Sequence, residues 1–456
     1  MLKKLQSNHQ FSFFTSFEEQ LDRSHPLYLL ANKIDWQLLE SQLSPLYSHR
    51  GRPAKPIRLM CGLLILKHVR NLSDESVVEQ YGENAYYQYF CGGLQFESKF
   101  PCASSELVHF RHRIGEKGIE LILSLSIAIN DEDKPSSDDG VAFIDSTVQE
   151  KNITFPTDGK LHMKIIQHCW KIAKDNSIKI RQSYTRTVKR LSRTCRFANH
   201  PKNKKKARAA TRKIKTIAGR LVRELQRTLQ AEHSKQQDLT IFERVLAQTR
   251  KSTQKIYSLH EPEIQCISKG KAHKKYEFGN KVSIIWSNKG VIIGAQSFRN
   301  EYDGHTIEAS LEQSKRLLGY CIKLLVGDRG YRGTSQVGET QILIPKPSLK
   351  RDSRYQKEKK KRLMRKRAGI EPCIGHLKSD FRLSRNMYKG VFGDTINVML
   401  AAAAYNFKRA MRALFVPIFR AMIAMLYFIW YVMFESSSIF LCNSGLPIKA
   451  NGVTKS

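Results

Sequence analysis

Two carboxylates in this sequence stand at or just after the end of short apolar runs. Asp145 ends the run that begins at Val141, and Asp328 follows the run 322–326 after one glycine. Runs of this length predict buried strands. The end of a strand can hold a charged group rigidly beside a crevice at the edge of the sheet, where substrate can reach it. Acids after strands are also common in plain turns, so this pair alone identifies no chemistry.

A third acid, Glu371, stands in a strongly basic segment. Residues 346–389 contain 16 Lys or Arg and only four Asp or Glu. If the segment is helical, offsets of −4 and +7 place Arg367 and Lys378 on the face of Glu371. An acid flanked by bases on one face suits a metal-binding carboxylate beside a track of phosphates. The basic stripe continues through Arg382 and Arg385.

Pro372 limits this facial relation. Proline does not fit a helix interior, so the helix either kinks at this point or begins there. In the second case Arg367 precedes the helix, and the facial relation to Glu371 holds only from Lys378 onward.

The charge balance indicates a polyanionic partner. The 456 residues include 77 Lys or Arg against 41 Asp or Glu, which gives a formal charge of +36. Nucleic acid is the commonest partner of such a chain, although an anionic membrane surface or a ribosomal location would also fit. Apolar content of 41% and charged content of 26% are ordinary for a globular protein, which argues against wholesale disorder.

Much of the excess charge lies in one block. Residues 181–227 contain 17 Lys or Arg and a single acid, Glu224, with alanines and leucines that favour helix. We expect this block to be too like-charged to pack alone and to lie on phosphate; the alternative is a solvated, charged helix pair. Its densest run is Lys204, Lys205 and Lys206.

Residues 1–130 are predicted to be helical, with a buried helix over 57–69 and a helix start at Ser73. A further helix begins at Ser104. Its polar face is either a DNA-reading surface or a solvated face of a packing helix, and the sequence favours neither. That face carries His109, Arg111, His112 and Arg113.

The rest of the chain predicts an α/β or α+β core. A polar linker spans 131–140, and a basic helical insertion spans 176–261 between two parts of the core, 141–175 and 262–412. The second part contains predicted strands at 281–286, 291–298, 322–326 and 342–345 and helices at 306–318 and 395–412.

The remaining signals are weaker. The nine cysteines show no C-x-x-C spacing, so we expect reduced thiols of a cytoplasmic protein, and no secretory signal follows Met1. His273 and His305 lack partners at metal-ligand spacing, which favours structural or DNA-contact roles. The apolar tail 413–456 has an uninterrupted stretch of 14 residues, 421–434, which is short for a membrane anchor.

The set of motifs resembles the DDE-type transposases of bacterial insertion sequences. The resemblance covers about residues 25–410, and its last motif is usually Tyr, two residues, Arg, three residues, Glu, six residues, Lys. Here Arg367, Glu371 and Lys378 match, whereas the tyrosine position is Met364. The stretches that carry the resemblance are 143–158, 269–281, 302–306, 327–331 and 367–378.

The resemblance implies a ribonuclease-H-like mixed sheet behind a helical DNA-binding domain. It implies that Asp145, Asp328 and Glu371 hold two Mg²⁺ ions, with Mn²⁺ as a substitute, while Arg367 and Lys378 hold phosphates. The expected partners are terminal inverted repeats and target DNA, bound by a homodimer at the nucleoid, without stable membrane association.

Three other interpretations remain open. Loss of a triad carboxylate would favour an inactive DNA-binding relic, and all three are present. A structure-specific nuclease of the same fold would not need repeat ends, and the large basic insertion argues mildly against it. A basic membrane-attached protein would stay on membranes at high salt, whereas salt should release a DNA-bound one.

Overall fold

The computed structural model describes residues 16–48, 50–130, 140–196, 200–229, 234–249, 251–268, 275–299, 301–345 and 352–443, without the side chains of 417–424 and 426–443. Residues 131–139 of the predicted linker, His273 and residues 444–456 of the apolar tail therefore lie outside the described residues. The chain folds into two compact units. Unit 1 comprises 1–67, 72–110 and 406–456, and unit 2 comprises 68–71 and 111–405.

The described part of unit 1 is helical, as expected. Helix α4 is buried on almost every face because its apolar residues fill all positions except a few. Helix α5 starts where predicted, since the Ser73 side chain accepts a hydrogen bond from the Ser76 amide at 3.0 Å. The helices are α1 (Phe17–Gln20), α2 (Pro26–Lys33), α3 (Trp36–Leu43), α4 (Ile57–Val69), α5 (Asp74–Glu83), α6 (Ala85–Phe90) and the start of α7 (Ser104–Ala128).

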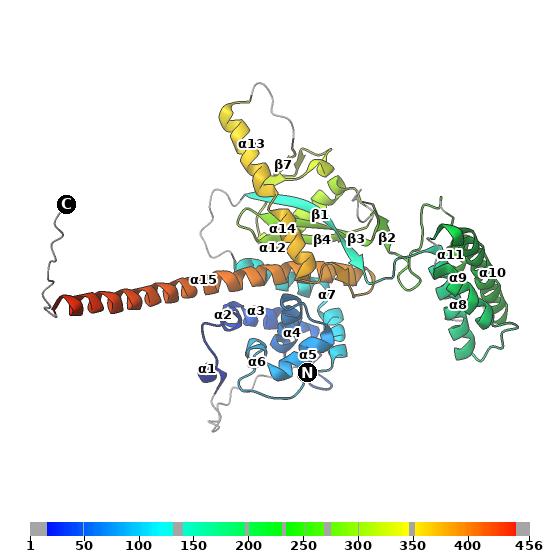
Figure 1. Cartoon of the computed structure of the whole chain (residues 1–456), viewed down its shortest axis with the longest axis horizontal. Coiled ribbons are helices and arrows are strands. Elements are labelled where there is room, and N and C mark those ends of the chain that lie inside the picture. Colours follow the sequence, from blue (N-terminus) through cyan, green and yellow to red (C-terminus); the bar gives the residue numbers. More distant parts are fainter. Residues whose placement is uncertain are drawn as a thin grey trace, which may run out of the picture. The chain divides into compact units, whose positions relative to one another are not determined.

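Unit 2 contains a mixed sheet in the order β2-β3-β1-β5-β7-β6, with β4 beside β3 and β8 beside β1. Figure 1 labels β1, β2, β3, β4 and β7 of this sheet. The longest strands, β1 and β3, are antiparallel, whereas β1–β5 and β5–β7 are parallel. The strands are β1 (Val141–Lys151), β2 (Gln265–Ile267), β3 (Glu277–Ser287), β4 (Ile292–Phe298), β5 (Leu324–Val326), β6 (Gln336–Val337), β7 (Thr340–Leu343) and β8 (Arg385–Asn386).

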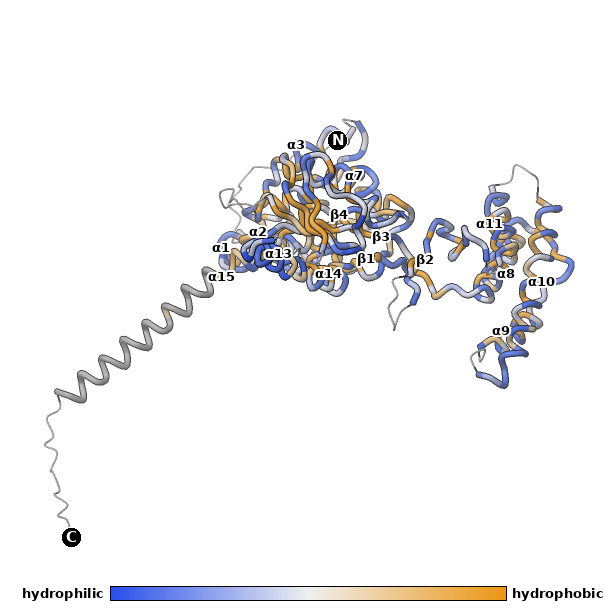
Figure 2. The backbone as a smooth tube through the Cα atoms, turned by 90° about the horizontal axis from the view of Figure 1, so that it is seen from above, coloured by the Kyte–Doolittle hydropathy of each residue, from blue (hydrophilic) through white to orange (hydrophobic). Residues whose placement is uncertain are grey.

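The centre of this sheet is apolar, and helices complete the α/β core that we expected. Phe143, Ile144 and Ile284 are fully buried, and hydrophobic residues gather along these strands in Figure 2. The β3–β4 hairpin turns where predicted, with Gly290 at a positive φ of 85°. Strand β8 was not predicted, because two residues carry no periodicity. The helices beside the sheet are α12 (Ile307–Leu318), α13 (Arg354–Arg367), α14 (Ile370–Ser379) and the start of α15 (Gly390–Asn443).

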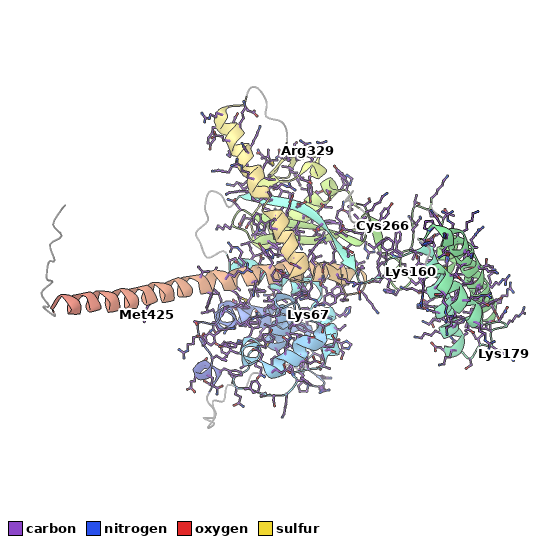
Figure 3. All side chains as sticks on the ribbon, viewed as in Figure 1. Lys67, Lys160, Lys179, Cys266, Arg329 and Met425 are labelled. Atoms are coloured by element: carbon purple, nitrogen blue, oxygen red, sulfur yellow. The ribbon has the colours of Figure 1, made fainter. Side chains whose placement is uncertain are left out.

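The basic block folds differently from our expectation. It does pack, because apolar residues recur on one face of α10 every three or four positions and meet α8, α9 and α11 (Figure 1). Ile165 of α8 shares this core, so the bundle begins before residue 176. Exposed lysines such as Lys179 project from it (Figure 3). The helices are α8 (Asp158–Asp175), α9 (Thr185–Arg196), α10 (Lys204–Thr228) and α11 (Gln236–Ala247).

Two further features bear on the class of protein. In the part of the chain that the structure describes, no helix is long and apolar enough to cross a lipid bilayer. The eight cysteines whose side chains the structure describes are free thiols, and five of them are buried.

Candidate active site

Asp145 lies in the middle of β1 and not at its end, which corrects our prediction. The strand continues to Lys151 because β3 pairs with it on one side, with Asp145 opposite Ile284. On the other side the parallel pairing with β5 stops at Phe143 and Val326. Asp145 therefore stands just beyond the end of its shorter neighbour, where the sheet opens.

Asp328 follows β5 at that opening. Its Oδ1 accepts a hydrogen bond from the Gly330 amide at 2.8 Å, which fixes the carboxylate at the start of the short turn Arg329–Tyr331. The adjacent Arg329 is labelled in Figure 3. The Asp328 side chain is 41% exposed, so its carboxylate is open to solvent and ligand.

Arg367 links the two carboxylates. Its Nη2 atom lies 3.2 Å from Asp145 Oδ2 and 4.0 Å from Asp328 Oδ2. The side chains of Arg367 and Asp145 are each only 16% exposed. A cation thus already lies between the two acids, so the pair suits a divalent metal ion, for which carboxylate oxygens are preferred ligands.

Glu371 lies on a different helix from Arg367. Helix α13 ends at Arg367 and α14 begins at Ile370, so Pro372 occupies the first turn of α14, where proline is tolerated. The second alternative for Pro372 therefore holds, and the facial relation to Glu371 applies only from Lys378 onward. Helix α14 packs against β1, and the Glu371 side chain is exposed.

The arrangement brings together two of the three predicted acids. Among the described residues, no group of three or more His, Cys, Asp or Glu side chains is placed to hold a metal ion. Asp145 and Asp328 share the guanidinium of Arg367, whereas Glu371 remains outside this cluster.

The sequence alone assigned no role to three residues near the site, Asp303, Lys281 and Tyr331. All three lie within the motifs quoted for the resemblance. A Cβ atom at Gly330 would lie 2.9 Å from Asp328 Oδ1 and 3.1 Å from Asp303 Oδ2, so these carboxylates converge there. Lys281 Nζ pairs with Asp303 Oδ1 at 3.1 Å. Burial raises the pKa of Tyr331 well above its usual range, and nearby Asp303 and Asp145 raise it further, so its phenol stays protonated.

The predicted DNA-binding residues divide into exposed and buried ones. Arg111 is only 4% exposed, and its guanidinium lies 4.5 Å from the centre of the Tyr388 ring. It packs inside unit 2, which corrects its assignment to a DNA-reading face. The other candidates are at least partly exposed: Arg113, Lys204, Lys205, Lys206, Arg367, Lys378, Arg382 and Arg385.

Arg382, one of these exposed candidates, has a strained backbone conformation. Its φ is +67°, which non-glycine residues rarely adopt, and the Asn397 side chain donates a hydrogen bond to its carbonyl at 3.2 Å. His305 is exposed, and its ring lies 5.8 Å from that of Tyr302.

Comparison with known sequences assigns families to two parts of the chain. Residues 15–113 match the family described as Transposase domain (DUF772), and residues 248–407 match the family described as Transposase DDE domain. An uncharacterized protein, ORF8 in the nfe locus of Rhizobium meliloti, is 40% identical over 191 residues, which cover 40% of this chain and 92% of that protein. No solved structure matches. Asp145 and the helical bundle lie between the two matched regions.

Proposed function

Because the chain belongs to the DDE transposases of insertion sequences, we propose that it cleaves DNA at transposon ends and joins those ends to target DNA. Members of this family bind DNA and generally use a divalent metal ion, here proposed to be Mg²⁺, with Mn²⁺ as a substitute. The ribonuclease-H-like fold fits the mixed sheet of unit 2. The observation that carries the proposal is the pair Asp145 and Asp328 around one cationic group.

Each residue has a proposed part in the reaction. Asp145 and Asp328 hold the metal, and Glu371 joins them from the first turn of α14. Bound metal would activate the attacking water or 3′-hydroxyl and stabilise the leaving oxygen. Lys378, Arg382 and Arg385 hold the phosphates of the DNA end so that the scissile bond faces the carboxylates.

The basic outer surface of the helical bundle supports a second contact with DNA. Lys204, Lys205 and Lys206 are exposed at the start of α10, and Arg113 is an exposed candidate on α7. Because two ends must be joined to one target, we propose that the protein acts as a homodimer on DNA.

The test of the function uses purified protein and a duplex that carries the element's terminal repeat with flanking DNA. We expect Mg²⁺-dependent nicking at the repeat boundary by the wild type and none by Asp328→Ala, while DNA binding persists. Glu312→Gln, which changes an exposed acid on α12, is the matched control and should cleave normally. Tight binding without cleavage in Mg²⁺ or Mn²⁺ would contradict the active enzyme and leave a DNA-binding relic.

Replacing Lys204, Lys205 and Lys206 together by alanine should weaken DNA binding and reduce its salt dependence. A plot of log K for DNA binding against log salt concentration has a negative slope. Its magnitude decreases by about 0.9 for each phosphate of duplex DNA that the protein no longer neutralises. We would measure this slope by fluorescence anisotropy. Alanine at Lys160, Lys171 and Lys174, which are exposed on α8, is the control; equal slopes for both triple variants would contradict a specific role for the start of α10.

A further inference from the structure

We propose that Arg367 acts as an exchangeable internal cation, which neutralises Asp145 and Asp328 in the DNA-free protein and leaves them for a DNA phosphate when the metal binds. The inference rests on the proposed function and adds a regulation of its metal site. In this scheme DNA and metal bind cooperatively, because each favours the same position of one guanidinium.

The charges around Arg367 explain why it occupies this place without DNA. Two carboxylates that meet at a partly buried site repel each other, and a nearby cation relieves that repulsion. Arg367 Nη2 lies 3.2 Å from one acid and 4.0 Å from the other, so one positive charge serves both. A divalent ion between the same oxygens would repel the guanidinium.

The contact is also weaker than a structural arginine would make. Arginine frequently binds a carboxylate with two parallel hydrogen bonds, which is the stronger arrangement. Arg367 makes one such bond, from Nη2 to Asp145 Oδ2, and its buried Nε atom has no hydrogen-bond partner among the described residues. The guanidinium is therefore incompletely satisfied, and a phosphate could offer it the second bond.

The backbone around Arg367 is held, so the exchange needs only a rotation of the side chain. Lys366 Nζ donates a hydrogen bond to Asn288 Oδ1 at 2.9 Å. A Cβ atom at Gly369 would lie 2.9 Å from Trp286 Cη2, which shows how closely the chain passes the end of β3 there. The hydrogen bond and this close approach hold the segment that carries Arg367 beside the sheet.

Thermodynamic linkage makes the idea measurable. If DNA raises the affinity for metal by removing the guanidinium, metal must raise the affinity for DNA by the same factor. Couplings of this kind are typically about 5- to 150-fold. Removing the Arg367 side chain should give the DNA-free protein the higher affinity for metal that the wild type shows only with DNA. It should also abolish the coupling between DNA and metal.

The experiment titrates full-length protein with Mn²⁺ by calorimetry, with and without the terminal-repeat duplex. For Arg367→Met we expect a Kd for Mn²⁺ in the absence of DNA at least about fivefold lower than that of the wild type, with no further decrease on adding DNA. Arg365→Met removes the same charge from an exposed position of α13 and should behave as the wild type. Arg367→Lys keeps the charge and should restore most of the coupling.

The outcomes separate this inference from the function itself. Equal Kd values for the wild type and Arg367→Met, with Mn²⁺ binding abolished in Asp328→Asn, would overturn the exchange and leave the metal site intact. Mn²⁺ binding that persists unchanged in Asp328→Asn would contradict the metal site and the exchange together. Melting curves in EDTA add a second readout: Arg367→Met should unfold at a lower temperature than Arg365→Met, and Mn²⁺ should remove the difference.

Discussion

A Glu371→Gln protein is expected to bind terminal-repeat DNA as the wild type does and to cleave it roughly 10²- to 10³-fold more slowly, a range typical for loss of one preorganised charge-stabilising group. The change keeps the size of the side chain and removes only its charge. Glu371 is exposed on α14, so the folded state should lose little stability. Single-turnover cleavage in Mg²⁺ together with anisotropy binding would measure both quantities.

Glu358→Gln provides the matched control. Glu358 is an exposed acid on α13 that pairs only weakly with Arg354, four residues away, at 3.3 Å. Normal cleavage by this variant would show that the effect at Glu371 does not arise from net charge. A Glu371→Gln protein that cleaves at the wild-type rate would remove Glu371 from the site.

The structure offers one rival for the third carboxylate. Asp303 Oδ2 and Asp328 Oδ1 both approach Gly330, whereas Glu371 stands outside the cluster around Arg367. Asp303→Asn, assayed in parallel, therefore decides between the two acids. A large loss with Asp303→Asn and none with Glu371→Gln would assign the third position to Asp303.

The sequence predicted the elements that follow from periodicity and missed those that depend on pairing. Apolar runs located β3, β4 and β5, and the Ser73 cap located α5. The predicted end of β1 at Asp145 was wrong. The polar residues after Asp145 continue as a strand only because they pair with β3.

The candidate site shows the same division. Asp145 and Asp328 were found because each follows an apolar run, and the structure brings both to Arg367. The contact of Arg367 could not be derived from a helical wheel, since it crosses between separate elements. Arg111 was misassigned for a related reason: a basic side chain on a helix says nothing of the aromatic ring, here Tyr388, that covers it.

A buried ion cluster at the far end of β1 should dominate the stability of unit 2. Lys151 Nζ lies 2.7 Å from Asp394 Oδ1 and 3.0 Å from Glu261 Oε1, and it donates a hydrogen bond to the Tyr388 carbonyl at 2.8 Å. The side chains of Lys151 and Asp394 are each 4% exposed. One lysine thus ties β1 to the loop before β2 and to the start of α15.

Lys151→Met is expected to lower the free energy of unfolding by about 3–5 kcal/mol, the usual cost of removing one partner of a buried ion pair. Methionine fills similar space, so the loss reports the uncompensated carboxylates and not a cavity. Urea denaturation followed by circular dichroism would measure it. The double variant Lys151→Met/Asp394→Asn should recover a large part of the free energy of unfolding that Lys151→Met loses. In the double variant, residue 394 carries no charge opposite the missing lysine.

The pH dependence of this loss follows from Asp394. Burial raises the pKa of Asp394 above its usual value, and Lys151 opposes that rise, so removing the lysine should raise it further. Below the pKa that Asp394 has in the folded protein, its carboxyl group is protonated and carries no unpaired charge. The stability that this proton gives to the folded state is lost as the pH rises through that pKa. The deficit of Lys151→Met should therefore be smaller at about pH 5 than at about pH 8, in the window above the ordinary aspartate pKa of about 3.9. A deficit independent of pH would mean that Asp394 does not set its size, and packing around Lys151 would then account for it.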